Sequence, residues 1–483
     1  MAQSSVPNVA AALGPRIMRL WLVALVGRIA YALIAPGFHA RDDYFHVLEP
    51  ALRWIDDPGW IWALSTTPGA GIRSHLLPKV VQALVEIGSD FTPGVQLRFV
   101  GAVLAFWSSL IIPLSWPLIE RLAPSEPRRQ IELGLLLALH PALIYGAPKL
   151  LIEVQCLPLL MASLSILVSS RAHLQTLAAG VLFGLGVYVR YQAITIAPFA
   201  LVALMKTKKP RWSKLLTVIA GAIVGLSLGG VYDLATDGRF LGPLLQNIGV
   251  NLEPSTELTR SSPLSYLGIV LALACPWTVL KVRWRALNSS PVMWALIAGI
   301  GSFILVHSLT PHKEERFLYP ILPMLLLVFG ILWQTISTQH RHLRLSVIYF
   351  HIGLTAVLFS VHPQQATRRA LEGVIETQSQ AVLSLGPEVQ SFYLRPQTLP
   401  VIRNRKFTNQ WLAEALKVSP ARAFFVISYA PQSESVVATL ENNQLTCEAP
   451  QTYTQNWADN LAFQLNPRHN IRRSPIETRL CRR

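Results

Sequence analysis

Charged residues are scarce in this chain, which has 483 residues but only 14% Asp, Glu, Lys and Arg. A soluble globule of this size would carry more charge, and 52% of the residues are apolar. Charge-free runs of about twenty residues recur, and this is the length that one helical membrane span requires. The composition therefore excludes a large soluble protein and predicts an all-α polytopic membrane protein.

Acidic residues are fewer than basic ones, 26 against 42, which gives a net charge of +16. So basic a chain could bind nucleic acid, but it has no basic domain and no basic stripe with interleaved aromatic residues. Its Lys and Arg residues instead cluster in short loops between apolar runs. This pattern excludes a nucleic-acid partner and fits a protein held in anionic membrane lipid.

Cysteine is rare, with four in the chain. Cys156 and Cys275 fall within apolar runs and are expected to be packing residues. Cys447 and Cys481 lie in the polar carboxyl-terminal part, and the sequence has no CxxC or Cys/His pattern that would bind a metal. The second pair therefore predicts a disulfide in an oxidising compartment.

About eleven apolar segments are predicted to span the membrane. They are 16–36, 97–118, 131–148, 150–169, 173–189, 191–205, 214–232, 264–281, 291–310, 317–336 and 343–361. The first lacks a small-residue cleavage site and is expected to be a retained signal anchor.

Loop charge predicts the orientation of these spans. If the amino end is cytoplasmic, five successive loops on that side carry basic residues, as the positive-inside rule requires. These residues are Arg121, Arg128 and Arg129; Arg171; Lys206, Lys208, Lys209, Arg211 and Lys214; Lys281, Arg283 and Arg285; and Arg341 and Arg344. The rule also requires a turn at Arg190, which makes 173–189 and 191–205 two separate segments.

This orientation predicts two domains. Residues 1–365 form a transmembrane module, in which an external loop, 37–96, carries two amphipathic helices. Residues 366–483 form a small external α/β domain. Its expected elements are a helix at Trp411–Val418, a buried strand at Ala423–Tyr429 and a helix end at Val436–Glu441.

An acidic string, Arg41-Asp42-Asp43-Tyr44-Phe45-His46, directly follows the first span. Asp is a favoured N-cap, so Asp42 has a structural interpretation at the start of the amphipathic helix. The functional alternative is a general base that takes a proton from an acceptor hydroxyl, with Asp43 as a second candidate. No cofactor is required, although the acidic pair beside His46 could hold a divalent metal.

A second charged string, His312-Lys313-Glu314-Glu315-Arg316-Phe317, precedes a late span. One interpretation is an interfacial loop whose cations extend toward water and pair with Glu314 and Glu315. The other is a site for the phosphate of a lipid, bound by the fork of Arg316, by the point charge of Lys313 and by His312. The two carboxylates would then orient these cations or bind sugar hydroxyls.

Further ionisable groups are predicted at the same outer rim. Each is either a satisfied interfacial charge or part of the site: Glu49, Arg73 and Glu153 would contact substrate, and Arg190 would join the phosphate site. Arg28, in the middle of the first span, either extends toward the interface or faces the bundle. Asp233 and Asn247 are expected to line the same cavity.

At these residues the sequence resembles the C-type glycosyltransferases, and within them family 22, the α-mannosyltransferases of N-glycan precursor and glycosylphosphatidylinositol anchor assembly. The shared strings are Arg41-Asp42-Asp43, Glu49-Pro50, Ile72-Arg73-Ser74-His75-Leu76-Leu77-Pro78 and His312-Lys313-Glu314-Glu315-Arg316-Phe317. The family has Pro where Arg41 stands, a longer acid at Asp43 and usually Gln at His46. The family's Trp-Glu-Trp string is replaced by Ser65-Thr66-Thr67-Pro68.

The resemblance implies an inverting transferase. It would move a hexose, with mannose favoured, from a polyprenyl- or dolichyl-phosphate sugar to a hydroxyl of a lipid-linked or glycan acceptor. One alternative is a C-type transferase that modifies lipid A, a wall polymer or a protein with another sugar. Another is a transporter of a lipid-linked substrate, but transporters place ionisable groups at the midplane between symmetric halves, and no internal repeat is found here.

The compartment is predicted from a missing signal. The only Asn-x-Ser/Thr site, Asn288-Ser289-Ser290, falls in a predicted inside loop. This favours a bacterial inner membrane with a periplasmic active site over an endoplasmic-reticulum membrane with a lumenal one.

Overall fold

The fold is that of a computed structural model. It describes residues 9–39, 43–60, 71–170, 172–205, 211–252, 262, 264–273, 281–285, 290–310, 313–336, 340–362, 364–374, 377, 379–387, 392–394, 399–404, 408–467 and 470–483. The chain divides into two compact units. The first comprises Met1–Ile34, Phe45–Gly88 and Arg98–Leu358, and the second comprises Ala35–Tyr44, Ser89–Leu97 and Phe359–Arg483. The division into functional domains 1–365 and 366–483 stays a prediction.

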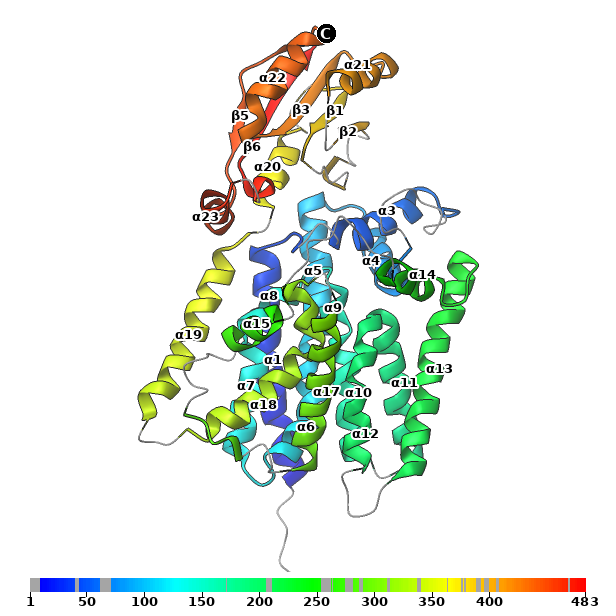
Figure 1. The fold of residues 1–483 in the computed structure, drawn as a ribbon, viewed down its shortest axis with the longest axis vertical. Coiled ribbons are helices and arrows are strands. Elements are labelled where there is room, and N and C mark those ends of the chain that lie inside the picture. Colours follow the sequence, from blue (N-terminus) through cyan, green and yellow to red (C-terminus); the bar gives the residue numbers. More distant parts are fainter. Residues whose placement is uncertain are drawn as a thin grey trace, which may run out of the picture. The chain divides into compact units, whose positions relative to one another are not determined.

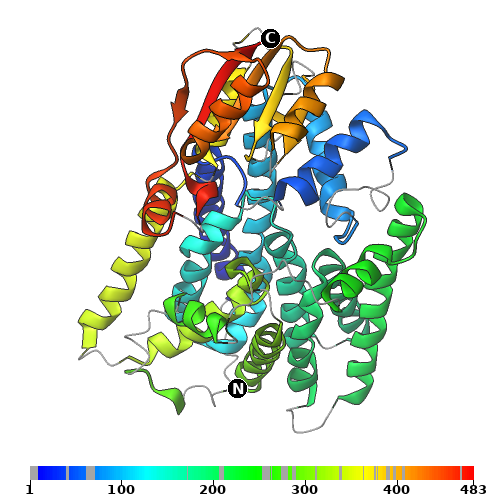
Figure 2. The ribbon, with the colours of Figure 1, turned by 45° about the horizontal axis from the view of Figure 1, so that its top comes forward.

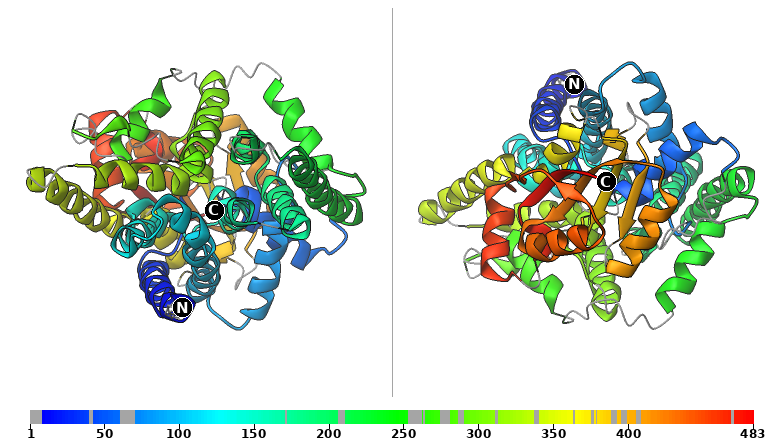
Figure 3. Two further views of the ribbon diagram at one scale, coloured as in Figure 1. Left: turned by 90° about the horizontal axis from the view of Figure 1, so that it is seen from below. Right: turned by 90° about the horizontal axis from the view of Figure 1, so that it is seen from above.

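The helices that lie wholly or mostly in the first unit are drawn in Figure 1, and most of the long ones are seen nearly end-on in Figure 3. They are α1 (Val9–Ile34), η1 (Tyr44–Leu48), α3 (Glu49–Asp56), α4 (Leu76–Ile87), α5 (Pro93–Ser109), α6 (Ile111–Leu122), α7 (Pro127–Leu139), α8 (Pro141–Gly146), α9 (Ile152–Gln155), α10 (Leu157–Ser169), α11 (His173–Val189), η3 (Tyr191–Ile196), α12 (Pro198–Met205), α13 (Trp212–Asp237), α14 (Gly242–Leu252), α15 (Ser265–Leu273), α17 (Pro291–Leu309), η5 (Glu315–Ile321), α18 (Leu322–Gln334) and α19 (Arg341–Ser360).

Proline residues mark where several of these helices begin. Pro127, Pro141 and Pro291 are the first residues of α7, α8 and α17. Proline suits this position because its fixed φ matches the helix and the first turn needs no donor from its nitrogen. Ser290 completes the start of α17, since its hydroxyl accepts a hydrogen bond from the Met293 nitrogen at 3.2 Å.

Seven helices in the described chain are long and apolar enough to cross a membrane. They are Gly14–Ile34, Pro93–Leu122, Ile152–Ser169, Trp212–Asp237, Pro291–Leu309, Glu315–Gln334 and Arg341–Val374, and His173–Val189 and Tyr191–Met205 are shorter apolar helices. The chain is therefore an integral multi-pass membrane protein, as predicted, while the count of eleven spans stays a prediction.

The predicted turn at Arg190 is present. Arg190 has extended backbone angles, φ −136° and ψ 97°, directly after α11. The 3₁₀ segment η3 and then α12 follow, so 173–189 and 191–205 are two helical segments, as the charge of the loops required. In Figure 1, α3, α4 and α14 lie at the upper end of the first unit, and α12 lies at the lower end.

Glycine residues allow α11 and α13 to pack backbone against backbone. A Cβ placed on Gly184 would collide with the Ala222 carbonyl oxygen, and one on Gly225 would collide with that of Val181. Small residues four apart are the usual basis of such close helix packing in membranes, where apolar burial gives no driving force between helices.

Arg28 faces the bundle. Its side chain is fully buried and donates to the carbonyl and hydroxyl oxygens of Ser108 and, at 3.1 Å, to the Leu137 carbonyl oxygen. Arg28 thus links α1 to α5 and α7 by hydrogen bonds. Of the two alternatives for Arg28, the structure has the second.

The second unit contains a mixed sheet with the order β2-β1-β3-β6-β4, and β5 also pairs with β6 (Figure 2). β1, β2 and β3 are parallel, and β6 is antiparallel to β3, β4 and β5. The elements are α20 (Gln365–Val374), β1 (Ala381–Leu385), β2 (Val401–Asn404), α21 (Asn409–Val418), β3 (Ala423–Tyr429), η8 (Ala430–Gln432), α22 (Ser433–Asn442), β4 (Thr446–Cys447), β5 (Gln451–Tyr453), α23 (Trp457–Leu465), η9 (Ile471–Arg473) and β6 (Ile476–Arg482).

The predicted elements of the tail are present in this unit. The strand Ala423–Tyr429 is the centre of the sheet, and the two predicted helical stretches lie in α21 and α22. Cys447 and Cys481 are opposite each other on β4 and β6 and are joined by a disulfide, the pairing that the sequence predicts. An α/β unit therefore follows the membrane helices, as expected.

Candidate active site

Four segments of the first unit, two of them helical, bring charged residues together. Glu153 lies in α9, Arg190 follows α11, and Arg316 lies in η5. Arg73 precedes α4 in a short segment, Gly71–His75, that has no regular secondary structure. We call Arg73, Glu153, Arg190 and Arg316 the cationic cluster.

Arg190 and Glu153 form the centre of this cluster. The Arg190 Nη2 lies 3.1 Å from Glu153 Oε1, and both side chains are buried, with 1% and 2% of their surface exposed. The Nε and Nη1 atoms of Arg190 are buried and have no hydrogen-bond partner among the described residues. Burial lowers the pKa of Arg190 to about 10, so the group is still a cation at neutral pH.

Arg316 approaches the same place from η5. Its Nε lies 2.5 Å from Glu314 Oε2, and its side chain is buried while that of Glu314 is 29% exposed. The guanidinium carbons of Arg190 and Arg316 lie 5.1 and 5.5 Å from the centre of the Phe317 ring. At these distances the aromatic ring attracts both cations.

Like charges act on one another within the cluster. Glu153 experiences the charges of Arg190, Arg316 and Arg73, and Arg190 experiences those of Arg73 and Arg316 as well as that of Glu153. The charges that act on Arg190 are thus two positive ones, from Arg73 and Arg316, and one negative one, from Glu153. A buried cation with unused donors is costly, and an anion with several oxygens would both neutralise the charge and accept those hydrogen bonds.

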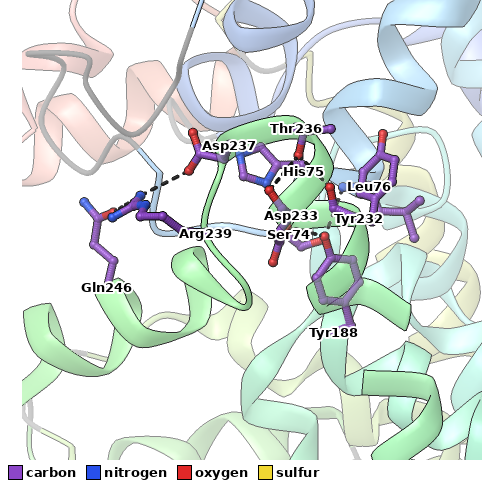
Figure 4. Close-up of polar contacts among 10 residues, drawn as sticks. All are labelled: Ser74, His75, Leu76, Tyr188, Tyr232, Asp233, Thr236, Asp237, Arg239 and Gln246. Carbon is purple, nitrogen blue, oxygen red and sulfur yellow. Dashed lines mark hydrogen bonds and ion pairs between the residues drawn. The ribbon is translucent and has the colours of Figure 1, made fainter. Parts of the chain in front are cut away.

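A second polar group lies beside the segment that carries Arg73 (Figure 4). His75 Nδ1 is 2.8 Å from Asp233 Oδ1 of α13, and the Tyr188 hydroxyl of α11 donates to the same oxygen at 2.5 Å. His75 and Asp233 are 1% and 0% exposed. Asn247 of α14 donates to the Ile72 carbonyl oxygen at 3.2 Å. Asp233 and Asn247 therefore hold the Arg73 segment, rather than simply lining a cavity.

The surroundings of the cationic cluster also include aromatic residues that the sequence did not single out. Tyr191 follows Arg190 and is affected by the charges of Asp233 and Arg73. Tyr266 and His307 have ring centres 6.5 Å apart, and the His307 Nδ1 donates to the Phe303 carbonyl oxygen at 2.8 Å. A signal was available for one pair, because Tyr188 and Tyr191 flank Arg190 at a helix end within an apolar stretch.

The remaining predicted residues have other neighbours. Glu49 forms an i,i+4 ion pair of 3.0 Å with Arg53. The Lys313 ammonium donates to the Thr310 carbonyl oxygen at 2.5 Å, and Glu315 is exposed. Asp43 belongs to the second unit, is buried and accepts a hydrogen bond from the His39 nitrogen at 2.8 Å. Asp42 and His312 lie outside the described residues.

Within the described residues, no group of three or more His, Cys, Asp and Glu side chains is arranged to hold a metal ion. The site as described consists of cations, one buried carboxylate and aromatic rings.

Two comparisons relate the chain to known proteins. Residues 19–386 match the model of the Alg9-like mannosyltransferase family. The fold is similar to two crystal structures of ArnT from Cupriavidus metallidurans. The one bound to undecaprenyl phosphate has a TM-score of 0.64 at 11% identity and covers 96% of this chain and 97% of that chain. The apo state has a TM-score of 0.67 at 12% identity, with 97% and 98% covered. No match was found among curated protein sequences.

Proposed function

Because the chain belongs to the Alg9-like mannosyltransferase family, it is a membrane glycosyltransferase of the C-type fold, and we propose its donor and acceptor. The donor is a polyprenyl- or dolichyl-phosphate sugar, and the sugar is a hexose, with mannose favoured. The acceptor is a hydroxyl of a lipid-linked or glycan molecule. The transfer inverts the configuration at the sugar carbon.

The main support for the proposed donor is the buried guanidinium of Arg190. It is a buried cation with two nitrogens that have no hydrogen-bond partner among the described residues, and Arg73 and Arg316 add charge of the same sign. A phosphate group supplies the oxygens that would satisfy these donors in a bidentate manner. The ArnT crystal structure with undecaprenyl phosphate shows that a protein of similar fold takes such a ligand, which supports the proposal.

The chemistry assigns a role to each group. The bond between the sugar carbon and the phosphate oxygen breaks, and the acceptor oxygen forms the new bond. The lipid phosphate leaves with an added negative charge, which Arg190, Arg316, Lys313 and His312 would stabilise. The acceptor proton passes to Asp42, with Asp43 as the second candidate.

The carboxylates have supporting roles in this proposal. Glu153 orients Arg190, Glu314 orients Arg316, and Glu315 and Glu49 contact sugar or acceptor hydroxyls. Arg73 contributes charge to the donor phosphate, and no metal is required for the transfer.

The proposal also includes the compartment in which the active site lies. We place the active site on the periplasmic side of a bacterial inner membrane. The disulfide between Cys447 and Cys481 supports an oxidising compartment for the second unit, because cytosolic thiols are kept reduced.

The test is release of the lipid phosphate when purified protein is given a lipid-linked or glycan acceptor with free hydroxyls and a panel of polyprenyl-phosphate sugars, mannose, glucose and a pentose among them. Mannose transfer with inversion is the expected result, and release from none of these donors would contradict the proposal. Asp42→Asn should abolish turnover while binding of the donor and the elution profile on size exclusion stay unchanged. Full turnover in that variant rules out Asp42 as the base.

Arg316→Lys tests the phosphate role more narrowly. Lysine keeps the charge but loses the planar fork, so donor use should fall by about tenfold or more, the effect of losing roughly 1.4 kcal/mol. The control is Arg128→Lys, because Arg128 is 91% exposed on α7 and pairs only loosely with Glu132 at 3.3 Å. Unchanged donor KM and kcat in Arg316→Lys would contradict its role.

A further inference from the structure

Arg73 lies on irregular backbone. Its charge acts on both members of the buried Arg190–Glu153 pair, so its position matters to the cationic cluster. The segment Gly71–His75 turns at Gly71, where φ is +68°, and enters α4 at Leu76. The stretch lies outside helix and strand, and its last residue joins α4 through the His75 carbonyl oxygen, which accepts a hydrogen bond from the Lys79 nitrogen at 3.0 Å. The side-chain contacts that attach the stretch to the bundle therefore help to determine where the Arg73 guanidinium can lie.

Two attachments flank Arg73. On the amino-terminal side, Asn247 donates to the Ile72 carbonyl oxygen. On the carboxyl-terminal side, His75 binds Asp233, which also accepts from Tyr188. Figure 4 shows His75 and Tyr188 converging on Asp233 from different elements. The segment is therefore tied to α11, α13 and α14 on either side of the one arginine that it carries.

The second attachment requires the burial of three polar side chains, which by itself is energetically unfavourable. His75, Tyr188 and Asp233 are buried polar side chains in a largely apolar bundle, and the Asp233 Oδ2 has no hydrogen-bond partner among the described residues. A side chain at Gly229, one turn before Asp233, would collide with the Tyr188 ring. Burying three polar groups is unfavourable unless they fix a particular arrangement.

We propose that Asp233, with Tyr188 and His75, is a positioning group for the donor site: it holds the Gly71–His75 segment so that Arg73 presents its charge to the lipid phosphate beside Arg190. The inference rests on the proposed donor role of the cationic cluster and adds three residues to it. None of the three touches the phosphate in this arrangement. Each acts through Arg73.

A purely structural anchor for α4 would give a different result. Removing such an anchor would lower the stability of the protein whatever residue stands at position 73. A positioning group should instead lose its effect on phosphate binding once Arg73 is gone, because the two substitutions then remove the same interaction.

A double-mutant cycle separates these cases. The probe is undecaprenyl phosphate, and its Kd is measured in detergent micelles for the full chain. Asp233→Asn should raise the Kd about tenfold, the effect of about 1.4 kcal/mol, in the parent chain. In the Arg73→Gln background the same substitution should leave the Kd unchanged. Asp237→Asn is the matched control, since Asp237 is buried one turn later on α13 and pairs with Arg239 at 3.1 Å, and it should change neither background.

Gentler variants at two other positions keep the test decisive if Asp233→Asn does not fold. Tyr188→Phe removes one donor and keeps the ring on Gly229, and it should show the same dependence on Arg73. His75→Ala should weaken phosphate binding, and His75→Asn should restore it, because an Asn amide can donate to Asp233 where the imidazole Nδ1 does.

The outcomes distinguish this inference from the proposed function. If Arg73→Gln weakens phosphate binding, but Asp233→Asn and Tyr188→Phe weaken it equally in both backgrounds, the positioning inference is wrong and the donor site stands. If Arg73→Gln alone leaves the Kd unchanged, Arg73 has no donor role and the inference fails with it.

Discussion

The Arg190 guanidinium and the Glu153 carboxylate form an ion pair of 3.1 Å in which both side chains are buried. Removing one partner of a buried pair leaves a charge without compensation, which typically costs about 3–5 kcal/mol. Glu153→Gln should therefore lower the thermal unfolding temperature in detergent strongly, because three guanidiniums then lack the carboxylate on which they act.

The control is Glu132→Gln on α7, whose partner Arg128 is almost fully exposed, and it should cost about 1 kcal/mol or less. Undecaprenyl phosphate should stabilise Glu153→Gln more than the parent chain, because the added anion replaces the lost negative charge. Equal stabilisation of both chains would mean that the phosphate does not bind at this cluster.

Arg28 allows a prediction that separates stability from activity. Arg28→Ala removes hydrogen bonds from a charged donor to Ser108 and Leu137, each of which is buried in the bundle. Unfolding should become easier by roughly 2–4 kcal/mol, while the donor KM of the folded fraction stays the same. Arg19→Ala, at an exposed position of the same helix, should be neutral in both measurements. A raised donor KM in Arg28→Ala would assign Arg28 to the site.

The sequence predicted the helices and the turn at Arg190 because both depend on local signals. Apolar runs define spans, and loop cations define their direction, so the two halves of 173–205 could be separated. Whether the Arg28 side chain points into the bundle or toward the membrane interface could not be predicted. The helix around it is apolar on nearly every side, and without a polar stripe no face is distinguished.

The candidate site was predicted as a set of residues but not as a set of contacts. Arg190, Glu153, Arg73 and Arg316 were each singled out as outer-rim charges, yet which cation pairs with which carboxylate depends on how α9, α11 and η5 pack. The link from His75 to Asp233 joins a loop to a distant helix and leaves no local pattern. In the second unit, β3 was predicted from its apolar run, whereas β6 was not, because Glu477, Arg479 and Arg482 interrupt it and leave no apolar run.

The close packing of α11 and α13 leads to a prediction about glycine. Gly184→Ala would place a methyl group against the Ala222 backbone, so the two helices must separate. Because Tyr188 and Asp233 lie on these same helices, both stability and undecaprenyl phosphate binding should fall. Gly301→Ala on α17 is the matched control, since no atom lies within 4 Å of its added Cβ. That variant should be neutral or slightly stabilising, and an effect as large as that of Gly184→Ala would contradict the packing argument.

The disulfide between Cys447 and Cys481 closes a loop with a sequence separation of 34 and should stabilise the second unit by about 2–4 kcal/mol. Cys447→Ser, Cys481→Ser and the double variant should therefore raise the rate of proteolysis within residues 359–483 to the same degree, since each breaks the same bond. Reducing agent should have this effect on the parent chain and none on the variants. If the double variant were cleaved much faster than either single one, the two sulfurs would act independently, and the case for an oxidising compartment would lose its support.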